Sequence, residues 1–186
     1  MPDDRSRTAG LRALAHPLRL RILSLLTGAP MTAADVAREL GTTHANASYH
    51  LRQLHAAGTI EIAGEERIRG GRAKRYRYDP DRGLPTAAPA TPEAAAASGG
   101  ADGEDLRLLF EALAGELRRR AERLVPGPGT LVTDAELWVD PDTLDDVRAR
   151  LAGASLDLHR AARPPRTPGT VRVNATVALF RMEPEA

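Results

Sequence analysis

The residues with the clearest chemical potential lie between positions 43 and 55. Apolar side chains recur there at helical spacing, and the intervening side chains can donate and accept hydrogen bonds. No acidic side chain occurs between residues 40 and 60. A helix with one apolar face and one such polar face, without negative charge, is suited to contact base edges and phosphates of DNA. The candidate contacts are Thr43, His44, Asn46, Ser48, Tyr49 and Arg52.

A basic segment with a different periodicity follows this helix. After Gly58 the apolar residues alternate, which is typical of strands, and Arg69-Gly70-Gly71-Arg72 predicts a turn. We therefore expect a β-hairpin that ends at Asp79-Pro80, with Tyr76 and Tyr78 packing on one face. Its many basic side chains suit phosphate or minor-groove contact. The candidate contacts here are Arg69, Arg72, Lys74 and Arg75.

The elements before position 43 must position these side chains. Residues 5–26 show a helical pattern that Pro17 interrupts, so we expect two helices that break near His16, with His16 as a helix cap rather than a metal ligand. Thr32, with Asp35 three residues later, predicts an N-cap for a short helix over 32–40. Gly41 then ends this helix, and Thr42-Thr43 caps the next one, which runs to Ala57. A short helix, a tight turn and a second helix form the arrangement that places the second helix in the DNA major groove.

The second half of the chain has a separate organisation. Residues 83–103 are rich in Ala, Pro and Gly and predict a linker, and residues 104–125 predict a long amphipathic helix. Alternation over 130–139 and 170–182 predicts two strands, with a helix between them that starts at Asp140-Pro141. Because two strands alone rarely form a stable sheet, we expect a dimer in which these strands join another subunit's sheet or lie against its long helix. The candidate dimerisation residues are Leu106, Leu109, Phe110, Leu113, Leu117 and Leu124.

The expected fold is therefore mainly α with a small β component (α+β). We expect a winged helix-turn-helix over residues 1–82 and a linker over residues 83–103. Residues 104–186 would then form a dimerisation and candidate effector-binding unit, built in the order helix, strand, helix, strand. The charge follows this division, because residues 1–82 hold 14 basic and 9 acidic side chains whereas residues 83–186 hold 12 and 16. A basic half joined to an acidic half is typical of a binding module fused to another unit.

Composition excludes several classes of protein. The chain of 186 residues contains no cysteine, which excludes disulfides, thiolate metal sites and cysteine nucleophiles. It has no apolar run of about 18 residues and no secretory signal at its start, so we expect a soluble cytoplasmic protein associated with the nucleoid. No glycine-rich phosphate loop, nucleophile elbow or paired-histidine metal motif occurs, so we expect no enzyme activity and no cofactor.

Four stretches of the basic half together resemble the ArsR-type winged-helix repressors: residues 14–23, 34–41, 47–54 and 57–58. The resemblance covers about residues 8–80 and implies a homodimeric transcriptional regulator. Many members of this family release DNA on binding metal, through a Cys-x-Cys pair or through Asp and His on a C-terminal dimer helix. This chain has no cysteine and no histidine in 104–125, so the resemblance does not extend to that metal switch.

Three functions remain open from the sequence. The first is a homodimeric repressor that reads an inverted-repeat operator. The second is a chromosome-architecture protein that binds double-stranded DNA with little sequence preference. The third is a regulator that senses an unknown small molecule at a site within 104–182, where the single tryptophan, Trp138, lies.

Overall fold

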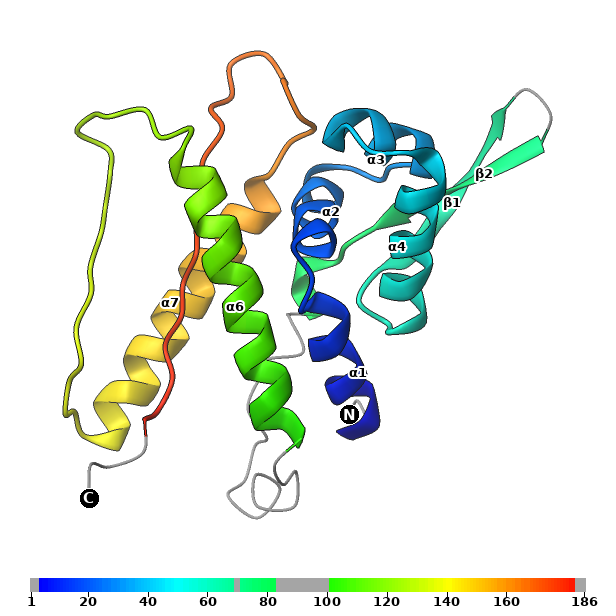
Figure 1. The fold of residues 1–186 in the computed structure, drawn as a ribbon. Helices are drawn as coiled ribbons and strands as arrows, with labels where there is room; N and C mark the ends of the chain where they lie inside the picture. The colour runs from blue at the N-terminus through cyan, green and yellow to red at the C-terminus, as the bar shows by residue number, and fades with distance from the viewer. Residues whose placement is uncertain (1–3, 69–70, 83–100, 183–186) are drawn as a thin grey trace.

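The computed structural model describes residues 4–68, 71–82 and 101–182 (Figure 1). Within these residues the chain forms six α-helices and one two-stranded antiparallel sheet, so the predicted α+β class is confirmed. The predicted linker lies outside the described residues except for positions 101–103, which already belong to a helix. The elements are α1 (Asp4–Leu14), α2 (Pro17–Gly28), α3 (Ala33–Leu40), α4 (His44–Ala56), β1 (Glu61–Ile68), β2 (Gly71–Arg77), the 3-10 turn η1 (Pro80–Arg82), α6 (Ala101–Ala121) and α7 (Pro141–Ala161).

The break between α1 and α2 occurs at His16, as the sequence predicts. The His16 backbone is extended (φ −152°, ψ 124°), and its Nδ1 accepts a hydrogen bond from the Leu18 N–H at 3.1 Å. Pro17 occupies the first position of α2. An N–H at this position has no acceptor within the helix, so the N–H that proline lacks costs no hydrogen bond. His16 is thus a helix cap, and α2 starts in a new direction from α1.

The hydrophobic core lies among α1 to α4 and the base of the hairpin. Tyr76 and Tyr78 are buried there, as the sequence predicts. Burying one large aliphatic side chain contributes roughly 1.5–3 kcal/mol, so the aliphatic residues of this core account for much of the domain's stability. The fully buried large side chains are Leu14, Ile22, Leu26, Val36, Leu51 and Leu54.

Helix α6 completes this core. Leu109 is buried, and Leu106 and Leu113 pack against the same cluster, so these three predicted dimerisation residues contact the protomer's own core. Helix α6 ends at Ala121, before the predicted residue 125, so Leu124 lies past the helix, and both Leu117 and Leu124 are exposed. Phe110 is half-buried, and its ring centroid lies 5.0 Å from that of Phe180. The leucine stripe therefore covers α1 and α2 with its first half and leaves its second half open.

Helix α7 begins as the sequence predicts. Asp140 is its N-cap and accepts a hydrogen bond from the Thr143 N–H at 2.8 Å, with Pro141 in the first turn. No residue of α7 is buried. The helix and the loop after it reach the N-terminal half through ion pairs of Arg160 with Asp81 and of Arg166 with Glu39. Among the described residues, no helix is both long and apolar enough to cross a membrane.

The prediction of two C-terminal strands is wrong for a single copy of the chain. Residues 130–139 and 170–182 run without helix or strand assignment, and neither pairs with another strand in the described part of the chain. Alternation of apolar and polar residues records a preference for extended backbone, but a strand also requires a neighbour to accept its hydrogen bonds. Among the residues that the structure describes, these segments have no such neighbour.

Candidate nucleic-acid interface

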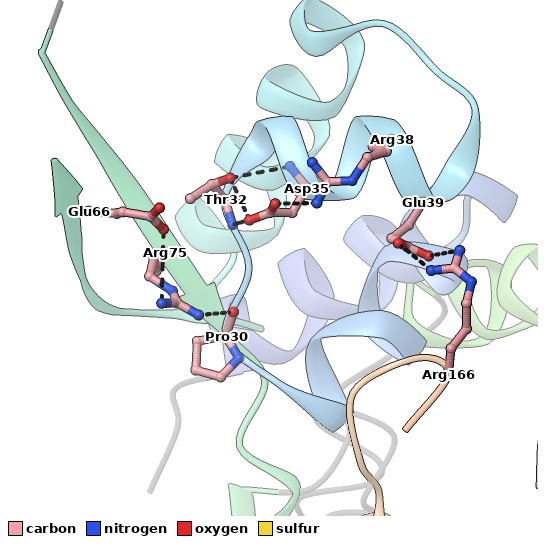
Figure 2. Close-up of polar contacts among 8 residues, drawn as sticks. All are labelled: Pro30, Thr32, Asp35, Arg38, Glu39, Glu66, Arg75 and Arg166. Atoms are coloured by element: carbon pink, nitrogen blue, oxygen red, sulfur yellow. Dashed lines mark hydrogen bonds and ion pairs between the residues drawn. The ribbon is translucent and has the colours of Figure 1, made fainter. Parts of the chain in front are cut away.

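The short helix α3 is fixed at both ends. Thr32 Oγ1 accepts a hydrogen bond from the Asp35 N–H at 3.2 Å, and Asp35 Oδ2 accepts one from the Thr32 N–H at 3.1 Å (Figure 2). Burial alone would raise the pKa of Asp35, but the bonds from Thr32 and the ion pair with Arg38 outweigh it and hold this pKa below its usual value. Gly41 ends the helix with a φ of +62°, a conformation that glycine adopts without strain.

The turn that follows sets the start of α4. Thr43 is the N-cap and accepts a hydrogen bond from the Asn46 N–H at 3.2 Å. The Asn46 side-chain amide donates to Thr42 Oγ1 at 2.9 Å, which ties the first turn of α4 to the preceding loop. Ala47, Leu51 and Leu54 are fully buried on the inner face, as their spacing predicts. This packing determines which face of α4 points to solvent.

The outer face of α4 carries the predicted contact residues. The side chains of Thr43, His44, Asn46 and Arg52 are exposed, Tyr49 is 51% exposed, and Ser48 is partly buried. The structure therefore brings all six residues to the accessible side of one helix. This face contains no acidic side chain, so a phosphate backbone can approach it without charge repulsion.

Beneath α4 the structure reveals a contact that sequence reasoning missed. His50 is buried, with 7% of its surface exposed, and its ring centroid lies 4.6 Å from that of His16. The Tyr49 ring meets His50 edge-on at 5.1 Å. Burial lowers the pKa of both histidines, and the nearby cation of Arg19 lowers each further. The position of His50 just before the buried Leu51 was the only signal for this packing in the sequence.

The hairpin projects from the α1–α4 core on the side away from α6 and α7 (Figure 1). Strands β1 and β2 pair antiparallel, with Ile62 opposite Tyr76, and the register shifts between Ile62 and Gly64. Met31 pairs with Tyr76 through two backbone hydrogen bonds of 3.0 and 2.8 Å, which fasten the base of the hairpin to the segment before α3. The hairpin and α4 are thus held in a defined relation by one core.

The predicted basic residues of the hairpin differ in their surroundings. Arg72 is 76% exposed and forms an ion pair with Glu65 at 3.0 Å. Lys74 is exposed and lies opposite Glu65 in the register. Arg75 donates to the Pro30 carbonyl oxygen at 2.8 Å, so its guanidinium holds the hairpin against the core (Figure 2). Arg69 lies outside the described residues.

Acidic residues of β1 partly neutralise the hairpin. Besides the pair of Arg72 with Glu65, Arg77 pairs with Glu61 at 2.5 Å and Arg75 lies 3.9 Å from Glu66. The described part of β1 and β2 holds five basic and three acidic side chains, so its net charge stays positive. Alternation alone did not show these pairs, because they depend on the register between the strands.

The described part of the C-terminal half has no comparable polar face of defined geometry. Within the described ranges, no group of three or more His, Cys, Asp or Glu side chains is arranged to hold a metal ion. Trp138 is 87% exposed and lies in the extended segment before α7. The polar face with a defined geometry is therefore that of α4, beside the hairpin.

Comparison with known proteins agrees with this geometry. A family model described as a helix-turn-helix domain matches residues 14–62, from the end of α1 through α4 into β1. No curated protein matches the chain. The matched segment contains α3, the turn and α4, the parts that such a domain uses to place its second helix in the major groove. The chain carries a helix-turn-helix domain, followed by a β-hairpin, of the kind found in DNA-binding transcription regulators.

Proposed function

We propose that this protein is a homodimeric transcriptional repressor that reads an inverted-repeat operator. The observation that carries the proposal is the exposed, acid-free outer face of α4 beside a hairpin of net positive charge. In this arrangement α4 enters the major groove, and the residues of its first turns meet base edges. The hairpin acts as a wing on the flanking phosphates, with Arg72 and Lys74 among its exposed cations.

A dimer follows from the need to read two half-sites. One α4 spans only part of one groove, and two-fold symmetry between subunits matches the symmetry of an inverted repeat. The half-sites would lie about one or two helical turns apart. Leu117 on α6 and Leu124 just past its end remain exposed beyond the part of α6 that covers the core, and they support a subunit contact there. The repressor role rests on the resemblance to ArsR-type regulators.

The signal that releases DNA would not be a thiolate-bound metal. Cysteine is absent from the chain, so no Cys-x-Cys pair is present to bind one. We also propose no catalytic activity, because the polar residues of α4 and the hairpin are accounted for by DNA contact and by folding. The protein would act on the nucleoid through binding alone.

The test is selection of genomic fragments by the full-length protein, followed by gel-shift titration of the selected site. We expect an inverted repeat, a dimer in sedimentation, and affinity that falls by several orders of magnitude as salt rises, because about 4–6 phosphate contacts per subunit release counterions. Random DNA should compete poorly. Equal competition by random DNA would show a chromosome-architecture protein instead and would refute the proposal.

A further inference from the structure

Two extended segments of the C-terminal half lie without strand partners: residues 131–139 and 171–182. Within the described residues, no backbone-to-backbone hydrogen bond involves either segment. Their large apolar side chains are open to solvent, with Leu131 89%, Trp138 87% and Val171 84% exposed. Single exposed apolar residues are common on protein surfaces, whereas large apolar areas mark interaction sites. Unpaired extended backbone is in addition a template for another strand.

The two segments are complementary in sequence. Each carries apolar side chains at odd positions, with Ala135 and Leu137 in the first and Val173 and Val177 in the second. The even positions differ in charge, because the first segment carries two carboxylates there and the second carries the cation of Arg172. In a sheet, successive side chains point to opposite faces, so pairing the two segments aligns apolar with apolar and acid with base.

We propose that residues 131–139 of one copy pair with residues 171–179 of a second copy, and the reverse, to form an intermolecular β-sheet. The proposal rests on the homodimer proposed above and identifies the surface that builds it. Pairing between the two segments sets Asp134 or Glu136 against Arg172 of the other copy. Antiparallel pairing of the first segment with itself around Ala135 would instead set Asp134 against Glu136, and like charges directly opposite each other destabilise a sheet.

The second segment is already held by its own chain. The Asn174 side-chain oxygen accepts a hydrogen bond from Arg120 of α6 at 2.9 Å, and the Phe180 ring lies 5.0 Å from that of Phe110. Segment 171–182 therefore lies along α6 with its backbone unpaired (Figure 1). The anchor on α6 presents this strand in a fixed place, where a partner strand can add to it.

Pairing between copies is better than pairing within one copy. A two-stranded sheet within one chain would keep two open edges and would be marginally stable. Two copies related by a two-fold axis contribute four strands, and the two ladders can join at the axis into one four-stranded sheet, which a single chain cannot form from its two segments. Together the segments provide about 20 residues on each side, which is the size of a standard stable protein interface.

The absence of native cysteine makes disulfide cross-linking a clean test. We would prepare Ala135→Cys and Val173→Cys as two separate full-length proteins, mix them without DNA, oxidise them and run non-reducing gels. Position 135 faces position 173 both in a parallel register that pairs Asp134 with Arg172 and in an antiparallel register that pairs Glu136 with Arg172. Directly opposed residues lie within the distance that a disulfide spans.

We expect a product of twice the chain mass that forms in the mixture and far more slowly in either protein alone. The matched control is Ala152→Cys mixed with Val173→Cys, because Ala152 is exposed on α7 and outside both segments. Equal cross-linking in the control would overturn the proposal. The proposal would also be overturned if a variant with both cysteines formed a disulfide within one chain while the mixture of the two single variants gave no cross-link.

The readouts separate this proposal from the proposed function. A dimer in sedimentation that binds operator DNA but gives no cross-link would overturn the strand pairing and leave the repressor proposal standing. A cross-link specific to positions 135 and 173, in a protein that selects no operator, would support the strand pairing and overturn the repressor proposal. Circular dichroism of each single variant verifies that both fold before they are mixed.

Discussion

Arg166 forms a two-point ion pair with Glu39, which joins the loop after α7 to α3, the helix that precedes the turn into α4 (Figure 2). The two guanidinium nitrogens lie 2.9 and 2.8 Å from the two carboxylate oxygens. The Glu39 side chain is only 13% exposed, whereas that of Arg166 is 76% exposed. Arg166 has a φ of +65°, which residues other than glycine seldom adopt. The pair therefore holds an unusual backbone conformation and links the C-terminal half to α3.

Replacing Arg166 with alanine should release this loop. The Glu39 carboxylate would lose its partner, and residues 162–170 would lose their attachment to α3, so their amide hydrogens should exchange faster with solvent. Hydrogen exchange read by mass spectrometry measures this directly. Arg163→Ala, at an exposed position in the same loop, is the control and should leave exchange in 164–170 close to that of the natural chain. Unchanged exchange in Arg166→Ala would show that the ion pair does not hold the loop.

Arg72→Ala should weaken binding to operator and random DNA alike. A phosphate contact carries no sequence information, and each lost contact lowers the slope of log affinity against log salt by about one. The reverse change is Glu65→Gln, which releases Arg72 from its 3.0 Å ion pair and should strengthen binding to both DNAs. Gel-shift titrations at several salt concentrations measure both effects. Arg107→Ala, exposed on α6, is the control, and an unchanged slope in Arg72→Ala would remove the hairpin from the interface.

His44→Ala and Asn46→Ala should act on discrimination instead. Both side chains are exposed in the first turn of α4, the part of a recognition helix that meets base edges. Loss of one good base contact lowers the preference for operator over random DNA by about 1–3 kcal/mol. Competition titrations give this ratio, with Glu111→Ala on α6 as the control. Because Asn46 also bonds to Thr42, its variant needs a thermal-unfolding measurement to confirm that α4 still forms.

The helix-turn-helix could be predicted from the sequence because its signals are local. A cap at Thr32, a proline at position 17 and a glycine at position 41 each determine a helix end within a few residues. Local signals of this kind do not depend on which distant segment packs nearby. The break at His16, the start of α4 after Thr43 and the buried inner face of α4 all followed from them.

The parts that could not be predicted depend on distant partners. Periodicity identified the leucine face of α6 but not what covers it, and Leu109 proved to lie in the protomer's own core. The ion pair of Arg77 with Glu61 depends on the hairpin register, because a shift of one residue would place the two side chains on opposite faces of the sheet. The alternation over 130–139 likewise states a preference for a strand without supplying the second strand.

The adjacent histidines His16 and His50 predict a loss of stability in mild acid. Burial lowers the pKa of His50 and of His16 in the folded protein below the usual value of 6.5. Below pH 6.5 the unfolded chain therefore takes up protons that the folded chain does not, which favours unfolding. The stability is present in full above pH 6.5 and is lost as the pH falls from 6.5 toward the lowered pKa values of the folded state.

Thermal unfolding of His16→Asn and His50→Gln checks this dependence. Asparagine is a good N-cap, so His16→Asn keeps the bond to the Leu18 N–H while removing one titrating ring. Each variant should lose less stability between pH 7.5 and pH 5.5 than the natural chain does, and the double variant should lose least. Each protein's own melting temperature at pH 7.5 is the reference. Parallel curves for all four proteins would exclude the histidine pair as the cause.

Gly28 and Gly153 both lie in helices but have opposite surroundings. A Cβ built on Gly28, at the end of α2, would lie 2.4 Å from the Arg163 carbonyl oxygen, so an alanine there must displace the segment that follows α7. A Cβ on Gly153, in the middle of α7, would meet nothing within 4 Å. Gly28→Ala should therefore destabilise the protein by about 1–3 kcal/mol through crowding.

Gly153→Ala is the matched comparison and should stabilise the protein by about 0.5–1 kcal/mol, because alanine loses less backbone entropy in a helix than glycine does. Chemical denaturation of both variants gives the two signs. Both substitutions place an alanine at a helical position, so helix propensity acts in the same direction in each, and a difference in sign isolates the contact with Arg163. If Gly28→Ala stabilised the protein as much as Gly153→Ala, the segment after α7 would not rest on α2 in solution.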